Sequence, residues 1–239
     1  MSDLFGLLGF GDGGWGGALL MGAAVTITLA VTCAPIGLSL GLLVAVAARS
    51  PRRLPRSIAT VFSTVFRGLP ELLTLLLVYY GAQIAAQRIL AGLGLSGQFV
   101  TINAFAAAVV AFSLVLAAFS SEVWLSAFKT IPSGQWEAVR ALRLPRHTAF
   151  LRVILPQLMR TALPGLSNNW LTLLKDTSLV STISLIDIMR QTNLAVSATK
   201  QPLVFYAAAC ALYLVLSAMS GVLFTHAERY YGRHHQEAR

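Results

Sequence analysis

The chain of 239 residues is 56% hydrophobic and only 11% charged, with a mean hydropathy of +0.71. Soluble domains carry about 25% charged residues, so this composition excludes an ordinary water-soluble protein. The net charge of +9 first suggests nucleic acid, but the basic residues are grouped in short segments between apolar runs, which is typical of membrane topology. We therefore expect no nucleic-acid partner.

Five apolar segments are long enough to cross the hydrocarbon core of a bilayer, which takes roughly 20 residues of helix. They cover residues 18–48, 57–86, 99–121, 158–185 and 203–225. The second contains Pro70 near its start, and the fourth contains Pro164, Lys175 and Asp176. The sequence predicts an all-α integral membrane protein with five transmembrane helices in a single domain, residues 1–239.

The lysine and arginine residues predict the orientation. Most of the 18 lie in the connections after the first and third segments and in the carboxyl-terminal tail. Between segments on the opposite side there are only Arg88, Arg190 and Lys200. Because cytoplasmic connections are enriched in basic residues, we expect the amino terminus outside, in the periplasm, and the carboxyl terminus in the cytoplasm.

Within the apolar segments, Gly37 and Gly41 form a GxxxG pair, a spacing that lets a second helix approach closely. Cys33 and Cys210 both lie in apolar segments and are expected to pack as small hydrophobic residues rather than to form a disulfide or a metal site. The sequence contains no Gly-Lys-Ser or Gly-Lys-Thr for phosphate binding, so ATP would have to bind to another protein.

Residues 133–156 form the longest polar connection, with the sequence SGQWEAVRALRLPRHTAFLRVILP. Apolar residues recur at helical spacing, which predicts a short amphipathic helix, a break near Pro145 and a second short helix stopped by Pro156. Taken alone, such a basic amphipathic segment is also typical of a helix that lies on lipid headgroups.

The spacing in this segment resembles the EAA motif of binding-protein-dependent ABC importers. In that motif Glu-Ala-Ala is followed after three residues by Gly and nine residues later by Ile-x-Leu-Pro. Glu137, Ala138, Leu155 and Pro156 match, whereas Arg143 stands at the glycine position. A non-glycine residue with positive φ costs about 1 kcal/mol, so we favour a turn that has shifted toward Pro145.

Further short motifs in the expected order resemble the permeases of polar amino-acid ABC importers. They are Thr26-Ile-Thr-Leu, Phe66-Arg-Gly-Leu-Pro-Glu71, Ser120-Ser-Glu-Val, Ile131-Pro-x-Gly-Gln135, Asn168-Asn-Trp170 and Lys175-Asp-Thr-Ser-Leu179. The resemblance is greatest to permeases for histidine, lysine, arginine and ornithine and to those for opines. It implies an ABC type I importer permease fold in the bacterial inner membrane, and a transport subunit rather than an enzyme.

The resemblance also implies partners. These are a second permease subunit, identical or homologous, a dimer of cytoplasmic ATP-binding subunits that bind ATP and Mg, and a periplasmic substrate-binding protein. Membrane lipid surrounds the chain, and no cofactor or metal is expected in it. A secondary amino-acid carrier is the alternative, although such carriers usually contain internal repeats and none is evident.

Two groups of residues are expected to carry the function. In the family the EAA segment is the coupling helix that contacts the ATPase, which implies contacts by Glu137, Ala138, Arg140, Leu142 and Arg143. For substrate binding the candidates are Glu71, Asn168, Asn169 and Asp176. An isolated charge within a span costs about 2.5–3.5 kcal/mol on insertion scales, so Glu71 either holds a cationic substrate or pairs with Arg67. For Asp176, beside Lys175, a structural or gating role is the alternative.

Overall fold

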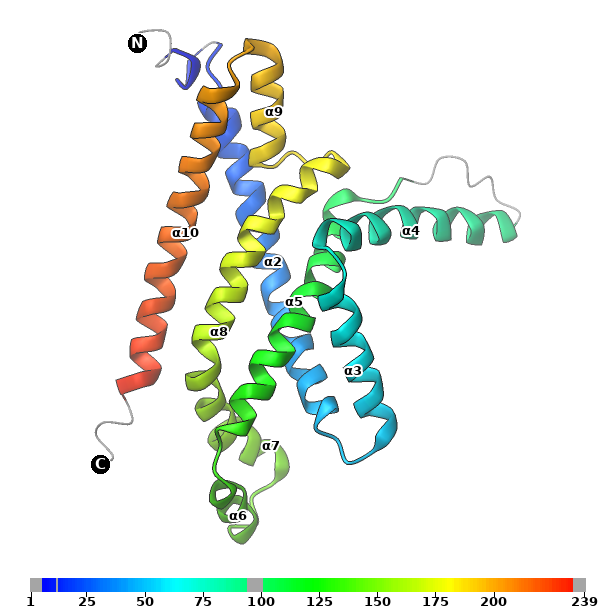
Figure 1. The fold of residues 1–239 in the computed structure, drawn as a ribbon, viewed down its shortest axis with the longest axis vertical. Helices are drawn as coiled ribbons and strands as arrows, with labels where there is room; N and C mark the ends of the chain where they lie inside the picture. The colour runs from blue at the N-terminus through cyan, green and yellow to red at the C-terminus, as the bar shows by residue number, and fades with distance from the viewer. Residues whose placement is uncertain (1–5, 12, 94–100, 234–239) are drawn as a thin grey trace.

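The computed structural model describes residues 6–11, 13–93 and 101–233, and its regular elements there are all helical. Figure 1 shows long helices side by side, with shorter helices at both ends of the bundle. In chain order they are α2 (Gly16–Ala48), α3 (Arg53–Gly68), α4 (Glu71–Gly92), α5 (Ala104–Lys129), α6 (Ser133–Ala141), α7 (Arg146–Ala149), the π-helix η2 (Phe150–Ile154), α8 (Leu155–Asp176), the 3₁₀-helix η3 (Thr177–Ile183), α9 (Ile188–Thr199) and α10 (Pro202–Arg233).

Four helices among the described residues are long and apolar enough to cross a membrane: Gly16–Ala48, Glu71–Gly92, Ala104–Lys129 and Pro202–Tyr230. The first, third and fifth predicted segments correspond to α2, α5 and α10. The fourth, residues 158–185, is helical as α8 and η3 but is not among the four. Its charged residues, Arg160, Lys175 and Asp176, keep its hydropathy low. The predicted count of five spans therefore does not follow from hydropathy alone.

The prediction that residues 57–86 form one continuous helix was wrong. The backbone becomes extended at Leu69, with φ −91° and ψ 140°, because the ring of Pro70 disfavours a helical conformation in the preceding residue. A new helix, α4, begins directly after the proline and runs sideways out of the bundle (Figure 1). The segment is thus divided into α3, which packs on α5, and α4.

Helices α2 and α5 pack closely because the GxxxG pair removes side chains from their contact. A Cβ atom at Gly37 would lie 2.7 Å from Leu116, and one at Gly41 would meet the hydroxyl of Ser120. The exposed backbone then accepts hydrogen bonds across the contact: Ser120 Oγ donates to Gly37 O at 3.4 Å, and Trp124 Nε1 to Leu38 O at 3.2 Å. The GxxxG spacing therefore positions α5.

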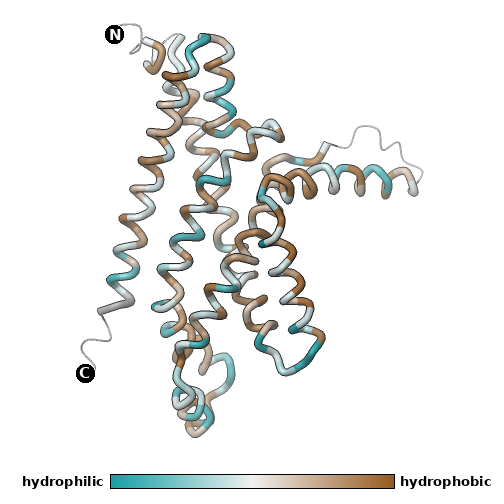
Figure 2. The backbone as a smooth tube through the Cα atoms, viewed as in Figure 1, coloured by the Kyte–Doolittle hydropathy of each residue, from teal (hydrophilic) through white to brown (hydrophobic). Residues whose placement is uncertain are grey.

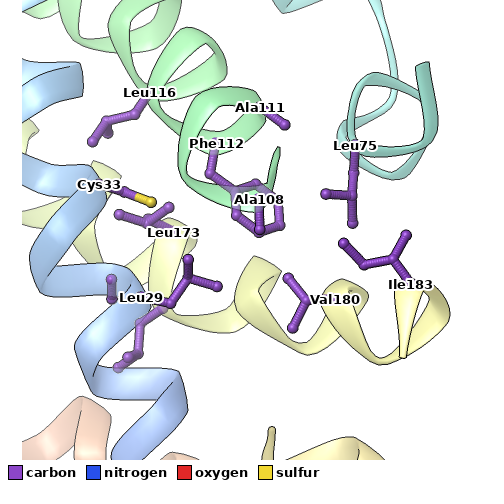
Figure 3. Packing of buried hydrophobic residues seen from close by; sticks show 12 residues of the cluster. Leu29, Cys33, Leu75, Ala108, Ala111, Phe112, Leu116, Leu173, Val180 and Ile183 are labelled. Carbon is purple, nitrogen blue, oxygen red and sulfur yellow. The ribbon is translucent and has the colours of Figure 1, made fainter. Parts of the chain in front are cut away.

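A hydrophobic cluster fills the middle of the bundle (Figure 3). Leu29 and Cys33 from α2 meet Phe112 from α5, and η3 and α8 supply further apolar side chains. Leu75 of α4 also reaches this cluster, and it ties the first turn of the lateral helix to the bundle. Cys33 is packed as predicted, whereas Cys210 lies on the exposed face of α10, so the prediction of packing was wrong for that cysteine.

A buried polar cluster lies where α2, α9 and α10 meet. Asp187 is fully buried and caps α9, since its Oδ1 accepts a hydrogen bond from the Arg190 backbone N–H at 2.8 Å. Its Oδ2, the hydroxyl of Tyr213 and the hydroxyl of Thr26 have no hydrogen-bond partner among the described residues. The helices approach closely here, because a Cβ at Gly22 would lie 2.7 Å from the Asp187 carbonyl oxygen.

The connections at the two ends of the bundle differ in their charges. Figure 2 shows hydrophilic segments at both ends and mostly hydrophobic residues between them. The connection from α2 to α3, the segment containing α6 and α7, and the carboxyl-terminal end of α10 all lie at the same end (Figure 1). These are the arginine-rich segments, so one end of the molecule carries most of the positive charge.

Candidate functional site

The segment 133–156 projects from the arginine-rich end of the bundle (Figure 1). It begins with α6, and the helix breaks before Pro145, as predicted. The prediction that Pro156 stops a second short helix was wrong, because α7, η2 and α8 follow one another without a break and Pro156 lies in the first turn of α8. The π-helical turn widens the spiral just before the proline, whose nitrogen has no hydrogen to donate.

The turn after α6 has not shifted toward Pro145, contrary to the prediction. Arg143 itself adopts the left-handed conformation, with φ 49°. Its N–H bonds to Arg140 O at 3.0 Å, and the Leu144 N–H bonds to Val139 O at 3.3 Å. These are the two bonds of a Schellman motif, in which glycine is usual at the left-handed position. An arginine there carries a conformational cost of about 1 kcal/mol.

The five residues expected to contact the ATPase lie on two faces of α6. Glu137, Ala138 and Leu142 are exposed, and Leu142 exposes 70% of its surface, which is unusual for a large apolar residue. Arg140 and Arg143 are also exposed, and they line a cavity between the coupling segment and the end of α2. Both faces are formed by residues that belong to the segment resembling the EAA motif.

Arg49, the residue that follows α2, connects the coupling segment to the bundle. Its guanidinium lies 4.2 Å from the ring centre of Phe128 on α5 and 5.5 Å from that of Trp136 on α6. Cation–π contacts at such distances contribute about 0.5–1 kcal/mol at exposed sites. The arginine therefore holds three elements together where the bundle meets α6.

A second cavity, of about 160 Å³, lies within the bundle between α5 and α8. Asn168, Asn169 and Asp176, three of the four predicted substrate residues, line this cavity together with Thr172. The Nδ2 of Asn169 is buried and has no hydrogen-bond partner among the described residues, so it is free to donate. The rest of the wall is apolar and comes mainly from α5: Phe112, Val115, Leu116, Phe119 and Leu173.

Glu71, the fourth predicted residue, is not among the residues that line this cavity. The alternative in which Glu71 pairs with Arg67 is wrong. Arg67 Nη1 instead lies 3.0 Å from Glu122 Oε1 on α5, and its guanidinium is 6.0 Å from the ring centre of Phe119. Glu71 is therefore left without an ion-pair partner among the described residues.

Sequence reasoning did not single out Glu122 or Thr172. Glu122 occurs in the Ser120-Ser-Glu-Val motif within an apolar segment, and its position there was the signal that it needs a partner. Thr172 lies one helical turn after Asn168, so the spacing alone places both on one face of α8. Among the described residues there is no group of three or more His, Cys, Asp or Glu side chains that could hold a metal ion.

A bundle of apolar helices, a polar cavity within it and an exposed helical segment at one end define a membrane transport subunit. Residues 37–230 match the family of binding-protein-dependent transport system inner membrane components, and the chain belongs to this family. Family membership confirms the predicted class of ABC transporter permease subunits, which are transport components and not enzymes. It also excludes the secondary carrier.

Similar proteins come from several bacteria. The chain is 38% identical over 213 residues to the arginine ABC transporter permease protein ArtQ of Escherichia coli K12, which covers 84% of this chain and 90% of ArtQ. It is 37% identical over 222 residues to the octopine transport system permease protein OccQ of Rhizobium meliloti, with 93% of each chain covered. It is 35% identical over 218 residues to the histidine/lysine/arginine/ornithine transport system permease protein HisQ of Escherichia coli K12, with 91% and 95% covered.

Solved structures agree with this assignment. A crystal structure of an amino acid ABC transporter with histidines superposes with a TM-score of 0.74 at 29% identity, covering 90% of this chain and 95% of that one. An inward-facing structure of the MetNI methionine ABC transporter superposes with a TM-score of 0.69 at 17% identity, covering 89% and 95%. The second likeness shows the fold alone.

Proposed function

We propose that this chain forms half of the translocation pathway of an importer for basic amino acids or opines. The observation that carries the proposal is the cavity lined by Asn168, Asn169 and Asp176. The relatives named for arginine, octopine and histidine transport support the same substrate class. In this proposal the chain is one transmembrane domain, and α8 is a span in addition to the four long apolar helices.

The polar groups of the cavity suit an amino acid with a cationic side chain. The free Nδ2 of Asn169 can donate a hydrogen bond to a substrate carboxylate, whereas the Asp176 and Glu71 carboxylates attract ammonium or guanidinium groups. Two carboxylates that lie close together repel each other, and a cation between them removes that repulsion. A neutral amino acid would leave it in place.

The cavity in this chain is small, which supports a second permease subunit as a partner. Pockets for small molecules usually enclose about 300–1,000 Å³, more than the 160 Å³ found here. Helix α4 projects from the bundle (Figure 1) and exposes Leu73, Leu77 and Tyr80. In a pair of permeases these apolar side chains pack against the partner, which then closes the cavity.

The arginine-rich end is proposed to face the cytoplasm, with the amino terminus in the periplasm. The exposed face of α6, which contains Glu137, Ala138 and Leu142, then docks on a dimer of ATP-binding subunits. Those subunits bind ATP and Mg, and this chain needs no cofactor. A substrate-binding protein delivers the amino acid at the opposite end.

The substrate assignment is tested with Glu71→Gln, which keeps the shape of the side chain and removes its charge. A carboxylate 4 Å from a cation contributes about 4 kcal/mol at an effective dielectric of 20, before desolvation is subtracted. We expect arginine uptake into proteoliposomes that contain the whole importer to fall at least tenfold, while the complex remains assembled.

The matched control is Glu228→Gln on α10, where the carboxylate accepts a hydrogen bond from Ser167 at 3.4 Å. This variant removes the same charge from a site outside the cavity lining, and arginine uptake should remain close to that of the wild type. Unchanged arginine uptake in Glu71→Gln would refute the role of this carboxylate, and a neutral polar amino acid would become an equal candidate for the substrate.

A further inference from the structure

The cavity beside the coupling segment is larger than the one within the bundle. It encloses about 1150 Å³ between the end of α2, the connection to α3, the end of α5 and the segment from α6 to η2. Four arginines line it: Arg49, Arg140, Arg143 and Arg146. We call it the basic cavity.

The basic cavity carries positive charge without a counter-charge. No aspartate or glutamate lines it, and none of its four arginines forms an ion pair with another described residue. Like charges that share a cavity repel one another, and an anion that enters lowers this repulsion. A guanidinium binds two oxygens of a phosphate group in one plane, so a phosphate is the anion that these side chains fit best.

The backbone at Arg143 points to the same conclusion. Its left-handed conformation, with φ 49°, is one that glycine adopts freely and arginine does not. Unfavourable backbone conformations persist in proteins mainly where they serve a function. The two hydrogen bonds of the Schellman motif hold this conformation, and the Arg143 side chain lines the basic cavity.

One face of α6 is turned toward the cavity. Trp136, Val139, Arg140 and Arg143 all line it, and they follow the i, i+3, i+4, i+7 spacing of a single helical face. Glu137, Ala138 and Leu142 do not line it and lie on the exposed remainder of the helix and its cap. The helix therefore separates an arginine face from the face proposed to meet the ATPase.

The opposite wall is formed by the end of α2 and its connection to α3, and it contains apolar residues beside Arg49 and Ser50. Val46 and Ala47 come from the last turn of α2, and Pro55 comes from the start of α3. The cavity thus joins a phosphate-binding wall to the end of an apolar span, which is where lipid headgroups meet acyl chains. A free phosphate ion would leave most of this volume and the apolar residues of this wall without contacts.

We propose that the basic cavity binds an anionic phospholipid, with its phosphodiester on Arg143 and Arg146 and the first part of its acyl chains against Val46, Ala47 and Pro55. Arg49, stacked between Phe128 and Trp136, forms the floor of the site. The lipid then lies between the coupling segment and the bundle, at the membrane face from which the coupling segment projects.

The test uses the complete importer, purified in a neutral detergent and freed of lipid. Native mass spectrometry measures its affinity for phosphatidylglycerol and for phosphatidylcholine with the same acyl chains. We expect the wild type to prefer phosphatidylglycerol and Arg143→Gly to bind it about fivefold more weakly, the ratio that corresponds to about 1 kcal/mol for one basic residue at an anionic surface. Arg143→Lys should retain most of the preference.

Two controls make the result specific. Arg190→Gln lowers the net charge by the same amount at the far end of the molecule, on α9, and should leave the lipid affinity unchanged. Arg143→Gly also removes the cost of the left-handed conformation, which glycine adopts freely, so its thermal stability in lipid-free detergent should rise while its lipid affinity falls. A general loss of structure would lower both, and Arg146→Gln would then test the site without a change at the turn.

Three results would overturn the proposal. The first is equal affinity of the wild type and both the Arg143→Gly and Arg146→Gln variants for phosphatidylglycerol. The second is displacement of the lipid by excess inorganic phosphate, which would show a site for a small anion. The third is a complex that binds no phosphatidylglycerol although the isolated chain does, which would assign the four arginines to the contact with the ATP-binding subunits.

Discussion

Asp187→Asn is expected to stabilise the protein at neutral pH. Burial raises the pKa of the Asp187 carboxyl to about 6, although backbone N–H groups of α9 lower it in part. Asparagine caps a helix about as well as aspartate, so the bond from the Arg190 N–H is retained. The new amide carries no charge, and it takes the place of a carboxylate whose Oδ2 has no hydrogen-bond partner among the described residues.

The magnitude follows from the two pKa values. An acid whose pKa is higher in the folded protein than in the unfolded chain destabilises the fold once the pH exceeds the unfolded value, here 3.8. The penalty for Asp187 is about 0.6 kcal/mol at pH 4 and grows to about 3 kcal/mol at pH 7.5. Loss of the favourable charge at the start of α9 offsets about 0.3–1 kcal/mol. We expect a net gain of about 2 kcal/mol at pH 7.5.

The assay is equilibrium unfolding by sodium dodecyl sulfate in mixed micelles, followed by circular dichroism at pH 4, 5.5 and 7.5. The gain in free energy of unfolding should shrink by about 2 kcal/mol between pH 7.5 and pH 4, because Asp187 in the folded wild type becomes protonated as the pH falls below about 6. Asp187→Ala, which also removes the cap, should be less stable than Asp187→Asn at every pH. A gain that does not depend on pH, or a loss at pH 7.5, would refute the reasoning.

Two further predictions concern the coupling helix and the helix contact. Glu137→Lys should leave membrane insertion intact, weaken ATPase binding by about 2–5 kcal/mol and abolish ATP hydrolysis stimulated by the binding protein. Wild-type stimulated hydrolysis in this variant would contradict the docking face on α6. Gly41→Ala should cost about 1–3 kcal/mol of unfolding free energy, because its Cβ would meet the Ser120 hydroxyl and would lie 2.8 Å from Ala117 O. The matched control is Gly81→Ala on α4, where the new Cβ would lie in open space. Helix propensity should raise its free energy of unfolding by about 0.5–1 kcal/mol. Equal effects of the two substitutions would show that the GxxxG contact is unimportant.

The sequence predicts the long helices because each is a sustained apolar run, and it predicts the break near Pro145 because proline lacks a backbone N–H. The same rule was wrong at Pro156, where the helix continues through a wider turn. Hydropathy also did not show that Pro70 starts a helix with its own direction. Direction depends on which side chains the new helix packs against, and Leu75 reaches α5 and η3 only in the folded chain.

At the candidate site, motif order predicted the cavity residues Asn168, Asn169 and Asp176, since they lie on one helix at suitable spacing. Motif order did not predict the ion-pair partner of Arg67. Glu71 is near in sequence, but the proline turns it away, and Glu122 on α5 approaches Arg67 instead. The turn at Arg143 was predicted wrongly because only the conformational cost of a left-handed arginine was considered. The two hydrogen bonds that close the Schellman motif outweigh this cost.

The break at Leu69 and Pro70 has a consequence for motion. Two backbone hydrogen bonds flank the break, one from Leu69 N–H to Val65 O and one from Thr74 N–H to Pro70 O. The first belongs to the end of α3 and the second to the start of α4. No backbone hydrogen bond among the described residues joins α3 to α4 across the break. Helix α3 is fastened to α5 by the Ser63–Ser121 hydrogen bond of 3.0 Å and by the Arg67–Glu122 pair. Helix α4 is held to the bundle by apolar packing, with Leu75 in the central cluster, so a movement about this break would separate apolar contacts while the hydrogen bonds of the bundle are kept.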